Sequence, residues 1–263
     1  IVSHLSPDRF VAVLGAQGVG LSRLQGQDQQ WLGSLGFIAE RSQAASQALD
    51  TLHSLLAEQR CKGAQLQLLL SAQYCRFCLV PWSAAINRPD ELHHYARACF
   101  EAHYGQSLDG WRLVVSPEAA GSARIATAVP EALLQRLNDH CRALGLRLRS
   151  VRPYLMAAYN RFAGQLGQGD FLFVLAEPQR SVCLLAQNGN WQQVSAQGCG
   201  DSDAALKALI ARQCELNAGE RELPVFLHAP GRLEQPPALS GVQLCALAEQ
   251  GGDVLCSMSR AVA

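Results

Sequence analysis

Short runs in which apolar and polar residues alternate open the chain. The segments 9–15 (RFVAVLG) and 19–25 (VGLSRLQ) each alternate with a period of two, and a glycine-rich corner joins them. This pattern is typical of two antiparallel strands and a tight turn, because successive side chains of a strand point to opposite faces of a sheet. A β-hairpin is therefore predicted at the start of the chain.

The same order of parts returns further along the chain. The segment 170–198 reads strand, turn, strand, polar turn and a third strand with a tryptophan, as the segment 9–36 does. When Val13 is set against Val174, the tryptophans of the two copies fall within one residue of register. This internal duplication predicts two lobes that each begin with a three-stranded antiparallel meander.

Apolar residues spaced three and four apart indicate helices between and after the two copies, and further alternating runs indicate strands. The predicted helices cover 42–58, 89–105, 130–145, 153–164 and 203–216. The predicted strands cover 64–71, 74–82, 111–116, 123–130, 146–151, 223–229 and 242–248. The last segment, 251–263, is compatible with a strand end followed by a short helix, and its pattern does not settle the matter.

This order of elements predicts the fold class. A meander followed by helix, strand, helix or loop, and strand is typical of a ribonuclease-H-like or actin-like lobe, and the chain contains it twice. The sequence therefore predicts an α/β protein with a two-lobed actin-like fold. The first lobe is expected to cover residues 1–165 and the second lobe residues 166–263.

Composition narrows the range of functions. The chain has 263 residues, of which 49% are apolar, and 22 basic residues balance 22 acidic ones. Because the formal net charge is zero, the charge balance does not indicate binding to nucleic acid or to an anionic membrane surface. No apolar run reaches the length of a membrane span, and the first residues lack the pattern of a signal peptide. The chain begins without methionine, so further residues are expected to precede Ile1. The ten cysteines are scattered through apolar segments, which favours a soluble protein of the reducing cytoplasm.

Two motifs suggest ligand chemistry, and the pattern around each argues against it. Gly15 and Gly20 have the spacing of a phosphate-binding loop, but Leu21 stands where that loop needs lysine, and a strand pattern follows instead of a helix. The glycines are better explained by a tight turn.

A second string has the spacing of zinc ligands: Cys75, Cys78, Cys99 and His103. Cys75 and Cys78 fall in a strand pattern, where residues three apart point to opposite faces, so buried cysteines are the simpler interpretation. No metal site is predicted.

The opening segment, AVLGAQGVGLSRL, resembles the first hairpin of the actin-like scaffold proteins of type IV pili and type II secretion systems, the family of PilM, GspL and MshI. Further resemblance lies in LVPW, which ends the strand at 74–82, and in ALGLRLRSVRP at 143–153. It extends over nearly the whole chain. The resemblance implies a small α/β subdomain inserted into the first lobe at about 65–130.

The same resemblance identifies positions of a nucleotide site and shows that its chemistry has been lost. Val13 stands where the family has an aspartate, and in the second hairpin Glu177 is the only nearby carboxylate. Only Gly231 remains of the adenosine-binding glycine pair. Carboxylates hold the magnesium ion of such a site, so their loss argues against ATP hydrolysis. The resemblance implies that Gly15, Gln17, Gly18, Glu177 and Gly231 occupy the positions of a degenerate nucleotide site. No catalytic residue and no cofactor are predicted, and ATP with magnesium is the less favoured alternative.

The resemblance implies a non-catalytic cytoplasmic scaffold, peripheral to or tethered at a bacterial inner membrane. Its expected partners are a PilN- or GspM-like inner-membrane protein and a GspE-like assembly ATPase, and a homodimer is compatible with the sequence. Docking in a groove between subdomains or addition of a strand at a sheet edge is the expected binding mode. The alternative function is an active actin-like ATPase or kinase that draws acids from Glu177, Asp170 or Asp201. A structural module with another partner is the third hypothesis.

Overall fold

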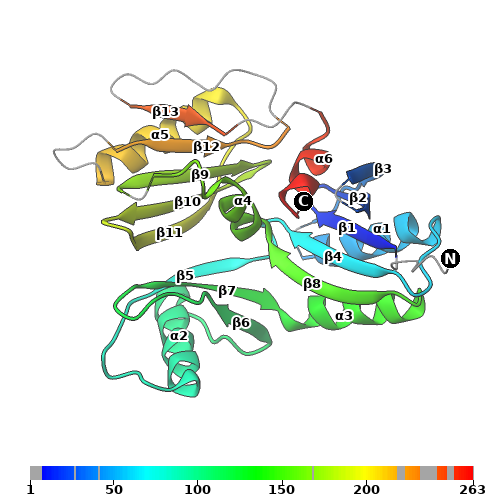
Figure 1. Ribbon diagram of the computed structural model, residues 1–263, viewed down its shortest axis with the longest axis horizontal. Coiled ribbons are helices and arrows are strands. Elements are labelled where there is room, and N and C mark those ends of the chain that lie inside the picture. The colour runs from blue at the N-terminus through cyan, green and yellow to red at the C-terminus, as the bar shows by residue number, and fades with distance from the viewer. Residues whose placement is uncertain are drawn as a thin grey trace.

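The chain forms two five-stranded sheets with the same strand order, one in each lobe (Figure 1). The computed structural model describes residues 8–26, 28–40, 42–167, 169–217, 223–231, 242–247 and 252–262. The first sheet has the order β3-β2-β1-β4-β8. Its strands are β1 (Arg9–Leu14), β2 (Gly18–Gln25), β3 (Asp28–Gly36), β4 (Gln65–Leu70) and β8 (Arg147–Pro153). The first three form the predicted antiparallel meander, while β4 runs parallel to β1, and β8 runs parallel to β4.

The second sheet repeats this arrangement with the order β11-β10-β9-β12-β13. Its strands are β9 (Phe171–Glu177), β10 (Arg180–Gln187), β11 (Asn190–Gly198), β12 (Val225–His228) and β13 (Leu244–Ala246). Both meanders carry an irregularity beside their tryptophan, next to Trp31 in the first lobe and next to Trp191 in the second. The predicted internal duplication is therefore present in the register of the strands as well as in their order.

Five helices lie where the spacing of apolar residues predicts them. They are α1 (Ala44–Ala57), α2 (Pro89–Tyr104), α3 (Glu131–Ala143), α4 (Tyr154–Phe162) and α5 (Asp203–Asn217). The start of α2 illustrates the local cause: Pro89 occupies the first turn, and the Glu91 carboxylate accepts the backbone N–H of Arg88. Gly105 ends this helix in the left-handed conformation, at φ 63°. None of the helices in these described parts is both long and apolar enough to cross a membrane.

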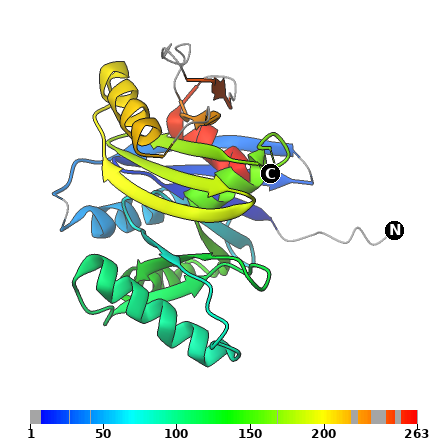
Figure 2. The ribbon, with the colours of Figure 1, turned by 90° about the vertical axis from the view of Figure 1, so that its left-hand side faces the viewer.

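A three-stranded antiparallel sheet is inserted into the first lobe. It consists of β5 (Arg76–Val80), β6 (Trp111–Val115) and β7 (Arg124–Pro130), in the order β5-β7-β6. Helix α2 covers the face of this sheet that points away from the two larger lobes (Figure 2) and buries Ala96 and Phe100 against it. The inserted sheet begins at Arg76, later than the predicted start near residue 65, because β4 pairs with β1 in the main sheet.

The two lobes share one apolar core. Phe10 and Leu68 of the first sheet and Phe173 and Leu184 of the second belong to the same buried cluster, which continues through α4. Strand β11 also lies alongside β5 of the inserted sheet (Figure 1), and the Trp191 Nε1–H donates to the Glu118 carboxylate at 3.3 Å. Apolar burial therefore holds the lobes together at their centre, and the inserted sheet supports the second lobe from the side.

A buried hydrogen-bonded pair crosses from α4 to the second lobe. The Tyr154 hydroxyl and His228 Nε2 lie 2.7 Å apart, and His228 Nδ1 lies 3.1 Å from the Leu247 carbonyl oxygen. Since a carbonyl only accepts, Nδ1 carries the proton and Nε2 accepts from the tyrosine. Burial lowers the pKa of His228 to about 4, so the ring is neutral near pH 7.

Replacing Tyr154 by Phe is expected to lower the free energy of unfolding by about 1–3 kcal/mol, because a buried ring nitrogen loses its donor. Urea denaturation measures this change. Tyr159→Phe on the same helix is the control, since none of the described residues hydrogen-bonds to the Tyr159 hydroxyl, and it is expected to cost much less. Equal losses for the two variants would show that the hydrogen bond to His228 contributes nothing.

Candidate functional site

The five predicted site positions gather around a cleft between the lobes. Gly15, Gln17, Gly18 and Glu177 line one cavity of about 420 Å³. Glu177 and Gly231 line an adjoining cavity of about 260 Å³. The two cavities have Glu177, Pro178 and Val254 in common. The turns β1–β2 and β9–β10 and the residues after β12 therefore meet at one place, as expected from two lobes with the same topology.

A short C-terminal helix occupies much of the space between these positions. Helix α6 (Val254–Ser259) lies against the first sheet and continues as a 3-10 turn, Arg260–Val262 (Figure 1). A Cβ atom added to Gly15 would lie 2.5 Å from Leu255 Cδ2, and one added to Gly20 would lie 2.8 Å from Leu255 Cβ. A Cβ on Gly231 would lie 2.8 Å from the Cα of Val254. Gly20 and Gly231 leave room for the close approach of α6 to their backbone, and Gly231 also has φ 75°, which favours glycine.

Polar contacts attach both ends of α6 to the first lobe. The Asp253 carboxylate accepts the Leu255 N–H at 2.7 Å, which caps the helix, and also accepts the Ser34 hydroxyl at 2.6 Å. At the other end, the Ser259 hydroxyl lies 3.1 Å from that of Ser22 and accepts from the Gln29 amide at 2.8 Å. Sequence reasoning missed this attachment, although an aspartate immediately before a short apolar segment is a helix-start signal.

The carboxylate that remains in the cleft is engaged in holding the lobes together. The Ala72 N–H, just beyond the end of β4, donates to both oxygens of Glu177 at 3.1 and 3.3 Å. Burial raises the pKa of this carboxyl to about 7, although hydrogen bonds from Ser71 and Ala72 and the charge of Arg180 oppose the shift. Val13, at the position that the resemblance assigns to an aspartate, is fully buried within β1.

Of the other acids proposed for a catalytic alternative, Asp170 lies away from Glu177 and Asp201 lies near it. Asp170 precedes β9, at the far end of the strand from Glu177, and accepts the Asn188 N–H at 2.7 Å. Asp201 lines the smaller cavity with Glu177, and its carboxylate accepts the Gln179 N–H at 2.6 Å. Both carboxylates therefore stabilise turns of the second lobe.

Of the zinc-like string, Cys78 and Cys99 belong to the same apolar cluster, whereas Cys75 lies in another. Cys75 is buried in the core shared by the two lobes, whereas Cys78 faces α2 in the core of the inserted sheet. Over the parts of the chain that the structure describes, no three His, Cys, Asp or Glu side chains come together, so none of them forms a closed structural metal site.

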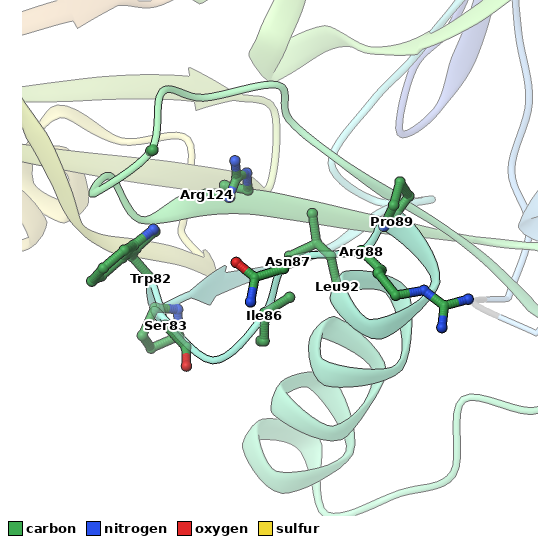
Figure 3. A pocket seen from close by; sticks show the side chains of 10 residues that line it. Trp82, Ser83, Ile86, Asn87, Arg88, Pro89, Leu92 and Arg124 are labelled. Carbon is green, nitrogen blue, oxygen red and sulfur yellow. The ribbon is translucent and has the colours of Figure 1, made fainter.

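Two hollows outside the cleft involve the inserted sheet, and sequence reasoning identified neither of them. The first lies at the start of α2, with Trp82 at one end and Arg88 at the other (Figure 3). Its guanidinium groups have partners: Arg88 pairs with Asp90 at 3.0 Å, and Arg124 donates to the Glu118 carbonyl oxygen at 2.9 Å. This hollow therefore offers mainly the half-exposed ring of Trp82 to a ligand.

The second hollow, here called the apolar groove, lies between the inserted sheet and the first lobe. It encloses about 310 Å³ and is lined by Arg112, Val114, Val115, Ser116, Pro117, Ile125, Thr127, Val129, Leu134, Val151, Pro153 and Met156. Strands β6 and β8, which both contribute to it, are edge strands of their sheets among the described elements. Val114 is 64% exposed at its rim. An open apolar surface beside unpaired strand edges is a suitable place for an extended peptide.

The paired meanders, the parallel strands that follow them and the cleft between the lobes define a two-lobed actin-like, or ribonuclease-H-like, fold. No protein-family model matches the sequence, and no curated protein matches it. Solved structures do match the fold. The cytoplasmic domain of EpsL, an inner-membrane component of the type II secretion system of Vibrio cholerae, has a TM-score of 0.63 at 16% identity, over 97% of this chain and 94% of that one.

Two further structures have the same fold. The PilM-PilN type IV pilus biogenesis complex matches with a TM-score of 0.63 at 14% identity, over 91% of this chain and 88% of the other. A Bacteroides thetaiotaomicron protein with an actin-like ATPase fold and unknown function matches with a TM-score of 0.58 at 11% identity, over 86% and 82% of the two chains. The predicted two-lobed actin-like fold is therefore confirmed, and the resemblance in fold to PilM and GspL with it.

The buried carboxyl of Glu177 makes the stability of the lobe contact depend on pH. In the folded protein the pKa of Glu177 is raised from 4.5 to about 7. The contribution of the protonated side chain to the free energy of unfolding is therefore complete below about pH 4.5 and is lost as the pH rises to about 7. Glutamine does not ionise, so Glu177→Gln does not lose stability at this position as the pH rises. In the unchanged protein that loss amounts to at most about 3 kcal/mol. The free energy of unfolding of the variant, relative to the unchanged protein, should therefore increase between pH 5 and pH 8.

Chemical denaturation of both proteins at several pH values measures this difference. His228 has a lowered pKa, so its own contribution falls as the pH drops from about 6.5 to 4, but it does so equally in both proteins. A difference between the two proteins that stays constant with pH would contradict the assignment to Glu177.

Proposed function

We propose that this chain is a non-catalytic scaffold of a type IV pilus or type II secretion assembly platform. The observation that carries the proposal is the state of the cleft, where Val254 and Leu255 of α6 occupy the space between the two lobe turns. Apolar side chains at that place offer nothing to phosphate or magnesium, which bind backbone N–H groups, cations and carboxylates. We infer that the chain has no catalytic residue and needs no cofactor.

The links between the lobes support the same view. A nucleotide-driven machine changes the arrangement of its domains during each cycle. Among the described residues, the polar contacts that join the second lobe to the rest include Glu177 with Ala72, Tyr154 with His228, and Trp191 with Glu118. A molecule held in this way is suited to presenting fixed binding surfaces.

The apolar groove is the surface that we propose for the principal partner. Its lining from β6, β7 and β8 suits apolar side chains, and the free edges of β6 and β8 suit main-chain hydrogen bonds with an extended segment. A cytoplasmic tail of an inner-membrane protein is such a segment. PilM, which has the same fold, forms a complex with PilN, and this supports a PilN- or GspM-like partner for the present chain.

The remaining parts of the proposal rest on the same fold comparison. EpsL is an inner-membrane component of its secretion system, which supports a location peripheral to or tethered at the inner membrane on the cytoplasmic side. A GspE-like assembly ATPase is the second proposed partner, and a homodimer is compatible with the surfaces described. The active ATPase or kinase that is the alternative would need acids in the cleft, and the engagement of Glu177, Asp170 and Asp201 speaks against it.

Crosslinking and affinity capture of the tagged protein from its native host test the proposal. The unchanged protein is expected to recover an inner-membrane pilus or secretion protein. Val114→Glu places a charge in the apolar groove and is expected to reduce that recovery about tenfold or more, since a buried unpaired charge costs well over 1.4 kcal/mol.

Leu216→Glu is the matched control, because Leu216 is 66% exposed on α5, far from the groove, and should leave the recovery unchanged. Recovery of no pilus or secretion component, or equal loss in both variants, would contradict the proposal.

A further inference from the structure

Two histidines face each other across the contact between α1 and α3. His53 Nδ1 and His140 Nδ1 lie 3.3 Å apart, and the ring planes are inclined at 68°. Both side chains are half-buried, so solvent reaches the pair. The residues are 87 positions apart in the sequence, and the packing of the two helices alone brings them together.

Charged side chains surround the pair on both helices. Asp50, one turn earlier on α1, lies 3.6 Å from Arg136, one turn earlier on α3. Asp139 precedes His140 and pairs with Arg142 at 3.7 Å. The pair therefore has one carboxylate within one turn on each helix, and Arg136 and Arg142 lie within about one turn of His140 on α3.

We propose that His53 and His140 form a binding site for a divalent transition-metal ion such as Zn²⁺. Imidazole nitrogens bind zinc at about 2.0–2.1 Å, and a tetrahedral angle then places two ligand nitrogens about 3.3–3.4 Å apart. The two Nδ1 atoms already have this separation. The ion requires no movement of either helix.

The tautomers of the pair suit this ligand, because a neutral imidazole has one ring nitrogen with a free lone pair. Without metal, one ring donates its Nδ1–H to the other. When the ion binds, that proton moves to Nε2 of the same ring, and no proton needs to leave the pair.

The site has two protein ligands, because no third His, Cys, Asp or Glu converges there among the described residues. Water completes the coordination, and Asp50 is the carboxylate that acts most strongly on His140. Such a site binds more weakly than a closed structural zinc site, and it stabilises the α1–α3 contact in proportion to the free metal concentration.

Thermal unfolding with increasing ZnCl₂, and again after addition of EDTA, tests the proposal on the whole chain. Saturating Zn²⁺ is expected to raise the Tm by about 3–6 °C, reversibly. His53→Gln and His140→Gln should each reduce this shift to less than about 1 °C. The double variant His93→Gln/His94→Gln, which removes two exposed histidines of α2, is the control and should keep the full shift.

Binding of Zn²⁺ by some of the ten cysteines is the competing explanation of a Tm shift. The visible spectrum of bound Co²⁺ distinguishes cysteine ligands from histidine ligands. Cobalt bound by imidazole and water lacks the intense thiolate charge-transfer absorption that cysteine ligands give. The proposal expects a weak visible spectrum that disappears in His140→Gln. A thiolate band, a Tm shift that persists in His53→Gln, or no shift in the unchanged protein would each overturn it.

Discussion

The packing of Leu255 against the glycines of the first hairpin is the contact on which the rest of the cleft depends. Gly15 and Gly20 let α6 approach the first sheet, and a side chain at Gly20 would meet both Leu255 and Trp31. Asp253 and Ser259 then fix the two ends of the helix by hydrogen bonds to β2 and β3. Helix α6 thus lies where the two lobe turns meet, with Leu255 against the glycines of the first hairpin.

Buried polar side chains between the lobes form hydrogen bonds across the lobe boundary. The Glu177 carboxyl accepts the N–H of Ala72, just beyond the end of β4. His228 is held neutral between Tyr154 and the Leu247 carbonyl oxygen. Glu177 and His228 are both hydrogen-bonded across or beside the lobe boundary, which stabilises one arrangement of the lobes because separating them would leave these groups without partners.

Much of the fold was predictable from the sequence because its signals are local. The alternation in 9–25, the glycine-rich turn and the repeated tryptophan predict both meanders, and helical spacing predicts α1 to α5. The site was predictable only in part. The positions of Gly15, Glu177 and Gly231 follow from the family resemblance, but the Glu177 carboxyl accepts a hydrogen bond from a residue 105 positions away. The segment 251–263 gives little periodic signal, so the place in the cleft of its described part, residues 252–262, depends on tertiary packing. The apolar groove was not predictable either, because its residues in β6, β7 and β8 have the alternating pattern of any partly buried strand.

Hydrogen exchange of the segments 9–25 and 252–262, measured by mass spectrometry with and without millimolar ATP and Mg²⁺, tests the central claim most directly. If α6 occupies the cleft and the chain binds no nucleotide, the exchange rates of both segments are the same in the two conditions. Protection of the β1–β2 turn together with faster exchange in α6 on addition of ATP would show that nucleotide displaces the helix, and would contradict the account.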